Sequence, residues 1–300
     1  MSPVELHHLA ALAAVVDEES FEAAADALRI TPPAVSQRIK ALETTVGQVL
    51  VRRARPVTVT DAGAPYLRLA RQVAALVHDT EVEVAGAGQS TSPAVVPVAI
   101  NSDSLGTWVL GALAPLSGAV SFDIHREDQD HSAALLRDGT VMAAVTTASR
   151  PVQGCTVSRL GVMTYRVVAS RVFADRWFSE PPASDGPDVD SLRAAPVVVF
   201  DRKDDLQDAY LRARGVPAAV PPRHHVPSSA DYADAVRLGM GWGLLPDQQC
   251  LDDLRSGALV ELDPEHRTDV MLYWQQWSLR TSALDQTSAA VHAAAARHLG

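Results

Sequence analysis

The chain has 300 residues, 47% of them hydrophobic and 21% charged, and a formal net charge of −10. This length suffices for two or three domains with buried cores, and the acidic balance excludes a polycation that coats nucleic acid. Cys155 and Cys250 cannot form a disulfide framework and share no metal-ligand spacing. There is no apolar run near the roughly 18 residues of a membrane span and no signal-peptide pattern, so a cytoplasmic protein without membrane contact is expected.

The first 28 residues predict two amphipathic helices. Apolar side chains recur at helical spacing from Leu6 to Val16, and Ser20 is placed to cap a second helix whose inner face starts at Phe21. Residues 5–28 hold six acids and no lysine or arginine. This end of the chain is therefore strongly acidic.

The stretch TPPAVSQRIKALE, residues 31–43, predicts a third helix with two unlike faces. Thr31 suits the cap position, and at 100° per residue Val35, Ile39 and Leu42 share one apolar stripe. The other side carries hydrogen-bonding and cationic side chains, which suits phosphates and base edges of DNA, although an ordinary solvated face has the same pattern. The residues expected at DNA are Thr31, Pro33, Ser36, Gln37, Arg38 and Lys40.

A basic hairpin is expected next. VLVRRARPVTVT, residues 49–60, has β-branched residues on both sides of a basic tip, as the wing of a winged helix does. Residues 29–55 hold six cations against the single acid Glu43, a local balance of +5 in an acidic chain. Arg52 and Arg53 are expected to contact phosphates.

A long helix is predicted after Thr60, before a flexible break at residues 86–93. Core packing within one chain and pairing with a second copy give similar patterns here. Pairing is favoured because no adjacent helix in the sequence is available to cover the stripe, and it would place two recognition helices on one face of a duplex. The stripe recurs at intervals of 3, 4, 3 and 4, a coiled-coil spacing, through Tyr66, Leu69, Val73, Leu76 and Thr80.

The last two hundred residues alternate short β-rich runs with helical ones, which is typical of α/β layering. Helices are expected from near Ser104 and over residues 131–136, 204–214, 229–239 and 282–299. Strands are expected over residues 97–100, 120–127, 141–147, 165–170, 196–200, 224–229, 241–246 and 269–279.

The sequence resembles a LysR-type transcriptional regulator over essentially its whole length. Residues 21–53, FEAAADALRITPPAVSQRIKALETTVGQVLVRR, are similar to the most characteristic block of that family. VTVTDAG at 57–63 resembles the end of the wing, and MGWGLLP at 240–246 resembles a segment of the effector domain. AINSDSLGTW at 99–108, REDQDHSAALLRDG at 126–139 and MLYW at 271–274 look like the ArgP/LysG branch, in which lysine or arginine controls genes such as amino-acid exporters.

This resemblance implies an α/β fold behind an N-terminal all-α winged helix-turn-helix. The boundaries expected are 1–60 for the DNA-binding domain, 61–90 for a linker and dimerisation helix, 94–166 with 269–300 for effector subdomain I, and 167–268 for subdomain II. The two subdomains should resemble those of periplasmic binding proteins. The partners implied are double-stranded promoter DNA, a second copy or a tetramer of the chain, and RNA polymerase, with no cofactor.

The expected effector site lies where strands of an open α/β sheet end, because ligands bind beyond their carboxyl ends. Hydroxyl groups there suit an α-carboxylate, an aspartate suits an ammonium group, and an acidic surplus repels acidic amino acids. Serine and aspartate near helix starts are also common caps. The expected contacts are Ser102, Asp103, Ser104, Glu127, Asp128, Thr146, Thr147, Asp204 and Ser228, with Asp201, Asp205 and Ser229 at the same edge.

Other functions have weaker support in the sequence. A metal site among residues 125–131 is disfavoured, since Asp128 would point away from His125 on a strand and Asp130 serves as a helix cap. The sequence has no GxGxxG after a strand and no phosphate-loop, HExxH or GxSxG motif, so no enzyme is predicted. A small-molecule-binding module with protein-contacting N-terminal helices remains the alternative, and the local balance of +5 argues against it.

Overall fold

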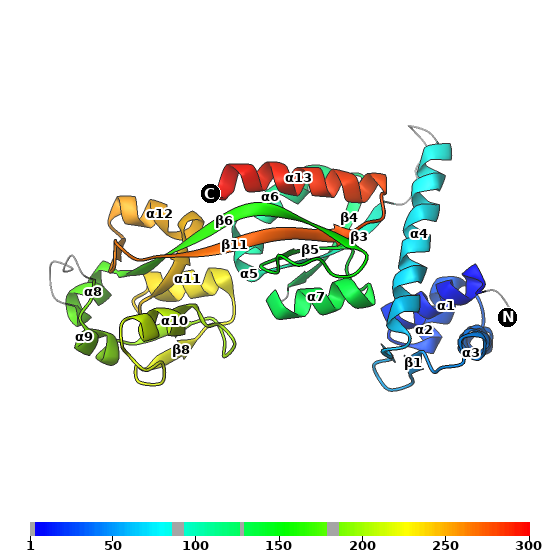
Figure 1. The fold of residues 1–300 in the computed structure, drawn as a ribbon, viewed down its shortest axis with the longest axis horizontal. Helices are drawn as coiled ribbons and strands as arrows, with labels where there is room; N and C mark the ends of the chain where they lie inside the picture. Colours follow the sequence, from blue (N-terminus) through cyan, green and yellow to red (C-terminus); the bar gives the residue numbers. More distant parts are fainter. Residues whose placement is uncertain (1–3, 86–92, 127–128, 179–185) are drawn as a thin grey trace. The chain divides into compact units, whose positions relative to one another are not determined.

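Short helices open the chain in the computed structural model (Figure 1). They are α1 (Leu6–Asp17), α2 (Phe21–Leu28) and α3 (Pro32–Val46). Both predicted caps are confirmed, since Ser20 Oγ accepts a hydrogen bond from the N–H of Ala23 and Thr31 Oγ1 accepts one from Ala34. The structure describes residues 4–85, 93–126, 129–178 and 186–300.

The predicted hairpin follows α3. Strand β1 (Val51–Arg52) pairs antiparallel with β2 (Thr58–Val59), and Val51 lies opposite Val59. Thr60 Oγ1 donates a hydrogen bond to the carbonyl of Val49 at 2.8 Å, which closes the base of the hairpin. Its basic tip therefore projects from a short, well-anchored ladder.

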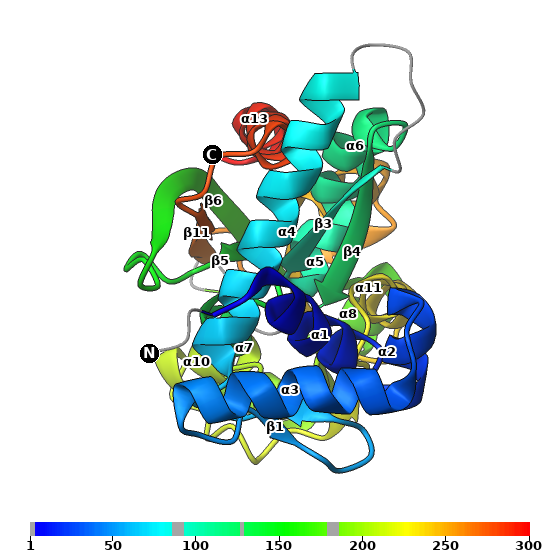
Figure 2. The ribbon, with the colours of Figure 1, turned by 90° about the vertical axis from the view of Figure 1, so that its right-hand side faces the viewer.

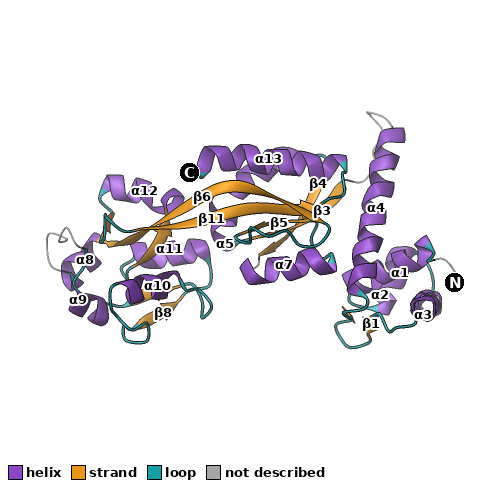
Figure 3. Cartoon of the chain, viewed as in Figure 1, coloured by secondary structure: helices purple, strands orange, loops and turns teal. Residues whose placement is uncertain are grey.

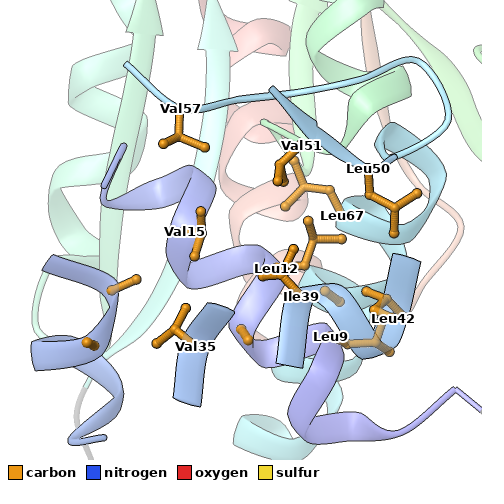
Figure 4. Packing of buried hydrophobic residues seen from close by; sticks show 14 residues of the cluster. Leu9, Leu12, Val15, Val35, Ile39, Leu42, Leu50, Val51, Val57 and Leu67 are labelled. Carbon is orange, nitrogen blue, oxygen red and sulfur yellow. The ribbon is translucent and has the colours of Figure 1, made fainter. Parts of the chain in front are cut away.

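One apolar cluster holds these helices and the hairpin together (Figure 4). The predicted inner stripe of the third helix is confirmed, because Val35, Ile39 and Leu42 are all fully buried. They pack with side chains from α1, from the hairpin and from the next helix, namely Leu9, Leu12, Val15, Leu50, Val51, Val57 and Leu67. Figure 2 shows α3 along its length with α1 above it.

The long helix α4 (Ala64–Ala85) has two unlike apolar sides. Leu67 and Ala70 are buried in the cluster just described. Within the predicted stripe, Tyr66 packs against that cluster and Val73 is half-buried, whereas Leu69 and Leu76 are 40% and 43% exposed, so part of this side is open to solvent. Among the described residues, no helix is long and apolar enough to cross a bilayer.

The strands that follow confirm the predicted α/β layering. Strand β3 (Ala94–Ile100) pairs in parallel with β4 (Val120–Arg126) and with β5 (Ala143–Thr146). Helix α7 (Gln129–Asp138) packs against β5 and β3. Because these strands are parallel, their carboxyl ends lie at one edge of the sheet.

The later part of the chain adds antiparallel strands and further helices (Figure 3). The long strand β6 (Cys155–Ser170) pairs with β9 (Gly243–Pro246) and β10 (Leu259–Glu261), and β7 (Val197–Val199) pairs in parallel with β8 (Arg223–His225). The remaining elements are β11 (Arg267–Trp277), α8 (Arg171–Trp177), α9 (Val189–Ala194), α10 (Leu206–Ala213), α11 (Ser229–Arg237), α12 (Asp247–Ser256) and α13 (Ser282–His298).

Packing divides the chain into two units. The first comprises Met1–Ile100, Pro115–Ser158 and Trp274–Ala289. The second comprises Asn101–Ala114, Arg159–Tyr273 and Ala290–Gly300. The chain therefore passes from one unit to the other several times.

The segment after β3 differs from the single helix that was predicted from near Ser104. It begins two residues earlier as α5 (Ser102–Ser104), continues as a π-helical turn (Leu105–Val109), and resumes as α6 (Leu110–Leu113) before a 3₁₀ turn (Ala114–Leu116). π-Helical turns inside helices often mark functional sites because the extra residue re-aims the neighbouring side chains. Strand β6 is also longer than the predicted 165–170, because the half-exposed residues 155–164 carry no clear alternation.

Candidate DNA-binding surface and effector site

The polar face of α3 lies on the outside of the N-terminal helices. Thr31, Pro33, Gln37 and Lys40 are exposed, while Ser36 and Arg38 are half-buried at its margins. The opposite face fills the core, so this face is the side of α3 that remains for a partner. Its side chains combine hydrogen-bonding groups with two cations, the chemistry needed at base edges and phosphates.

The wing places two further cations on the same domain. Arg52 and Arg53 are exposed. The Arg53 guanidinium lies 5.1 Å from the centre of the Phe21 ring, which holds it in a cation–π contact on α2. Such a contact restricts the arginine without using its N–H donors, which remain suited to a phosphate.

In the second unit, three side chains from distant parts of the sequence form a hydrogen-bond network with the Asp103 carboxylate, two of them directly and one through Ser229. Tyr165 on β6 donates its hydroxyl to Asp103 Oδ2 at 2.6 Å, and Ser229 on α11 donates to Asp103 Oδ1 at 2.7 Å. Gln249 on α12 donates from Nε2 to Ser229 Oγ at 2.8 Å. A carboxylate has about four acceptor positions, so two donors fix the Asp103 side chain and leave room for a cationic ligand.

Close backbone packing supports this network. A Cβ atom added at Gly106 would lie 3.5 Å from Ser229 Oγ and 3.8 Å from Gln249 Nε2. The π-helical turn thus brings its backbone next to the network, and Thr107 Oγ1 bonds back to the carbonyl of Asp103 at 2.6 Å. Gln249 Oε1 is buried and has no partner among the described residues, which leaves an acceptor available beside the carboxylate.

The network lies in a field of negative charge. Burial raises the pKa of the Asp204 carboxyl, and the charges of Asp103 and Asp201 raise it further. Hydrogen bonds from the N–H groups of Leu206 and Phe200 lower this pKa but do not cancel the rise. Burial also raises the pKa of Tyr165 well above its ordinary value, as does the adjacent Asp103 charge. Tyr165 therefore stays protonated as a donor, while the two carboxylates favour a cation.

The other predicted residues of the second unit have diverse surroundings. Ser102 begins α5 and is half-buried, whereas Ser104 is fully buried and its hydroxyl has no partner among the described residues. Ser228 caps α11 by accepting from the N–H of Asp231 at 3.5 Å. Ser228 is therefore a helix cap, the alternative role considered from the sequence, and its neighbour Ser229 donates the hydrogen bond to Asp103.

In the first unit, Thr146 ends β5 with only 2% of its surface exposed, and its hydroxyl accepts from the N–H of Ala148 at 3.1 Å. Thr147 follows it and is half-buried. The predicted contacts Glu127 and Asp128 lie outside the described residues.

Potential metal ligands gather at the start of α1. Glu5, His7 and His8 have ligand atoms within 4.8 Å of one another, and His7 Nδ1 lies 3.2 Å from Glu5 Oε2. Glu5 and His7 are exposed and His8 is half-buried, and exposed acidic groups of this kind are common without an ion. In the segment considered from sequence, His125 Nε2 pairs with Asp123 at 3.0 Å.

Tyr165 and Gln249 were not among the residues predicted from the sequence. Tyr165 lies in a strand with alternating apolar residues, where an aromatic side chain is expected to belong to the core. Gln249 lies in a polar helix, where its sequence context does not distinguish it from solvent-exposed neighbours. A sequence signal for Tyr165 would have required knowing that β6 runs beside Asp103. Trp274 is buried, and its Nε1 donates a hydrogen bond to Gln276 Oε1.

Two family models match consecutive parts of the chain. A model of bacterial regulatory helix-turn-helix proteins of the lysR family matches residues 6–64. A model of the LysR substrate binding domain matches residues 102–296. Together they cover both the exposed face of α3 and the Asp103 network.

Individual proteins are similar over nearly the whole length. The HTH-type transcriptional regulator LysG of Mycobacterium tuberculosis is 44% identical over 287 residues, which is 96% of this chain and 92% of that protein. The crystal structure of ArgP from the same organism has a TM-score of 0.85 at 43% identity and 97% coverage of each chain. Full-length LysG of Corynebacterium glutamicum with bound effector Arg has a TM-score of 0.78 at 36% identity, covering 98% of this chain and 99% of that one.

Proposed function

Because the chain belongs to the LysR family of bacterial transcriptional regulators, we propose that its activity at promoters is controlled by a basic amino acid, arginine or lysine. In this proposal residues 1–60 bind DNA and 61–90 pair subunits, while subdomains 94–166 with 269–300 and 167–268 bind the effector. The relatives that it resembles are named as regulators rather than as enzymes. The cytoplasm is the compartment, and RNA polymerase is the partner at the promoter.

The exposed face of α3 supports the DNA part of the proposal. Lys40 and Gln37 point away from the core and are accessible to a duplex, and the half-buried Arg38 lies at the margin of this face. The helix would lie in the major groove, and the wing residues Arg52 and Arg53 would contact flanking phosphates. The acidic remainder of the chain limits the contact to this domain, since it repels the DNA backbone elsewhere.

The Asp103 carboxylate is the single observation that carries the effector part. It is held by two neutral hydroxyl donors, Tyr165 and Ser229, so its negative charge is oriented without being neutralised. A bound ammonium or guanidinium group would neutralise that charge and relieve its repulsion with Asp204. A solved relative carries arginine as its effector, which agrees in charge with this site.

Individual roles follow from the chemistry of an amino acid. Asp103 would accept from the cationic group, with Gln249 Oε1 as a neutral second acceptor and Asp204 supplying longer-range attraction. The hydroxyls of Ser102, Thr146 and Thr147, and backbone N–H groups near them, would donate to the α-carboxylate. Ser104, Ser228, Glu127 and Asp128 complete the proposed set of contacts.

The open side of α4 supports assembly into a homodimer or homotetramer. Leu69, Leu76 and Val84 are 40%, 43% and 82% exposed on this helix. A second copy of the helix would cover them in a coiled-coil contact. The effector must then bind one arrangement of the oligomer more tightly than another, because equal affinity for both would shift nothing.

Calorimetric titration with each of the twenty amino acids tests the effector class. We expect heat from arginine or lysine and none from aspartate or glutamate, because the site repels acidic ligands. Binding of acidic or apolar amino acids alone would contradict the proposal. Recovery and sequencing of the genomic DNA bound by the protein would identify its target genes. We expect amino-acid export genes among them, because a Corynebacterium glutamicum relative is named a lysine export transcriptional regulatory protein.

A further inference from the structure

Helix α4 carries three polar side chains that bond to the backbone of the α/β part of the first unit. Arg68 donates to the carbonyls of Gln153 and Gly154 at 2.6 and 2.8 Å. Arg71 donates to the carbonyl of Gly139 at 2.6 Å. At 100° per residue these two positions and Asp79 fall within roughly 80° of one another, and the centre of this group lies about 110° from that of the exposed Leu69 and Leu76.

Asp79 adds a third anchor further along the helix. Its Oδ1 accepts from the backbone N–H of Ser282 at 2.9 Å, so a side chain of α4 caps the first turn of α13. Arg71 also forms an ion pair with Asp17 on α1. Arg71 therefore joins three parts of the unit, namely the DNA-binding helices, the linker helix and the carbonyl end of α7.

The contact is close enough to exclude side chains. A Cβ atom at Gly139 would lie 2.6 Å from Arg68 Cα, and one at Gly154 would overlap the Arg68 guanidinium. Both glycines have left-handed backbone angles, φ +82° and +74°. Glycine is needed at Gly139 on two counts, the backbone angle and the space that the linker helix occupies.

The acceptors of Arg68 belong to a loop that a single buried side chain organises. Gln275 is 1% exposed and donates from Nε2 to the carbonyls of Ala148 and Arg150, both at 2.9 Å. Its Oε1 accepts from the N–H of Val152 at 3.0 Å. The loop begins directly after Thr146, the last residue of β5, whose hydroxyl accepts a hydrogen bond from the N–H of Ala148. It ends at Gly154, whose carbonyl also accepts from the N–H of Ser278.

We propose that this loop, residues 147–154, is the element through which the effector state reaches the linker helix within one subunit. The inference rests on the proposed function, because it takes Thr146 and Thr147 as the effector end of the loop. A shift at Thr146 is transmitted because Gln275 bonds to three points of the loop backbone and Arg68 bonds to the carbonyls of Gln153 and Gly154 at its end. Arg71 lies one turn further along the same helix, and its carbonyl partner Gly139 lies outside the loop, just after α7. Arg71 then passes the shift to Asp17 and so to the DNA-binding helices.

Coupling of this kind is reciprocal, which provides a test that does not depend on the identity of the effector. Hydrogen exchange is measured in the full-length protein with and without a promoter fragment selected by the wild-type protein from genomic DNA. DNA is expected to change the exchange rate of the amides of Ala148, Val152 and Cys155 several-fold in the wild type. Arg68→Ala should remove that response. An unchanged response in Arg68→Ala, or none in the wild type, overturns the proposal.

A second substitution tests the contact between α4 and the α/β part of the unit from the side opposite to the arginines. Gly139→Ala leaves Arg68 and Arg71 intact, and its methyl group should push helix α4 away. Gly257→Ala is the control, because it adds the same methyl group at a similar backbone angle, φ +80°, where no atom lies within 4 Å. Arg137→Ala, an exposed arginine on α7, is the charge-matched control for Arg68→Ala. Both controls should behave as wild type, and equal behaviour of Gly139→Ala and Gly257→Ala counts against the contact.

The effector readout separates this inference from the proposed function. Arginine should alter the promoter affinity of the wild type by about fivefold or more, a typical coupling between sites. In Arg68→Ala and Gly139→Ala that ratio should fall to about one, while arginine affinity and effector-free DNA affinity stay within about threefold. If the wild type binds no arginine or lysine, the proposed function fails and the exchange experiment still decides the coupling. If the variants keep the full ratio, the coupling proposal fails alone.

Discussion

The face of α3 and the network at Asp103 differ in how each is built. The α3 face is made by thirteen consecutive residues, whose cap, proline and apolar stripe set the helix and leave its polar side outward. The Asp103 network draws its members from α5, β6, α11 and α12, and Tyr165 and Ser229 lie 62 and 126 positions after Asp103 in the sequence. One surface is local and exposed, and the other is assembled by the fold and partly buried.

The difference has energetic consequences. Exposed cations act on DNA mainly through phosphate charge, so their contributions are graded and fall with salt. Hydrogen-bonded groups in a half-buried site depend on one another, so removing one partner affects the rest. Substitutions in the effector network should therefore have larger effects on ligand affinity than single substitutions on α3 have on DNA affinity.

Removal of the central carboxylate should give the largest effect. Asp103→Ala is expected to weaken arginine and lysine binding by about 100-fold, because loss of one partner of a partly buried charge pair costs about 2–5 kcal/mol. The thermal shift induced by either ligand should disappear, and promoter affinity without effector should persist. Asp252→Asn, an exposed aspartate on α12, is the control. An unaltered ligand-induced shift in Asp103→Ala would remove Asp103 from the site.

Removal of one cation from α3 should have a smaller effect on the other surface. Lys40→Ala is expected to weaken promoter binding about tenfold, since one good groove contact contributes about 1–3 kcal/mol. The salt dependence should fall by about one unit if the ammonium meets a phosphate. Gel shift and calorimetry should show an unchanged arginine affinity, and Arg255→Ala on α12 is the charge-matched control. Full DNA affinity in Lys40→Ala would contradict the placement of this residue in the groove.

These two regions also show how far the sequence predicts the structure. The helices, both caps, the hairpin and the buried stripe at Val35, Ile39 and Leu42 follow from local spacing and are confirmed. The α/β alternation is confirmed as well, with the π-helical turn after Ser104 as an exception that no local pattern signals. Asp103 stands out as an acid after a buried strand, but Tyr165 and Gln249 acquire their roles only when distant segments meet.

Substituting the two hydroxyl donors to Asp103 tests whether the orientation of this carboxylate matters for ligand affinity in addition to its charge. Tyr165→Phe and Ser229→Ala each remove one hydrogen bond to Asp103 and keep the carboxylate. A loss of about five- to tenfold in arginine affinity is expected, the size of a typical net hydrogen bond, because these hydroxyls position the carboxylate. The double variant should lose more than the product of the two if Asp103 then rotates. Thr107→Ala, which removes a bond to the Asp103 backbone only, should have little effect. No change in either single variant would mean that Asp103 needs no positioning.

The smallest predicted effect concerns pH, and it separates Asp204 from Asp103. Burial raises the pKa of Asp204, so the folded protein holds that proton more tightly than the unfolded chain does. Its contribution to stability is therefore most favourable at low pH and declines as pH rises through the raised pKa. Bound arginine favours the ionised form, so arginine affinity should rise a few-fold as pH rises through the raised pKa of Asp204. Asp204→Asn should flatten that rise, as calorimetry would show, and should make the ligand-free protein more stable at pH 7.5, as thermal unfolding would show. An equally steep rise in Asp204→Asn would assign the titration to another group.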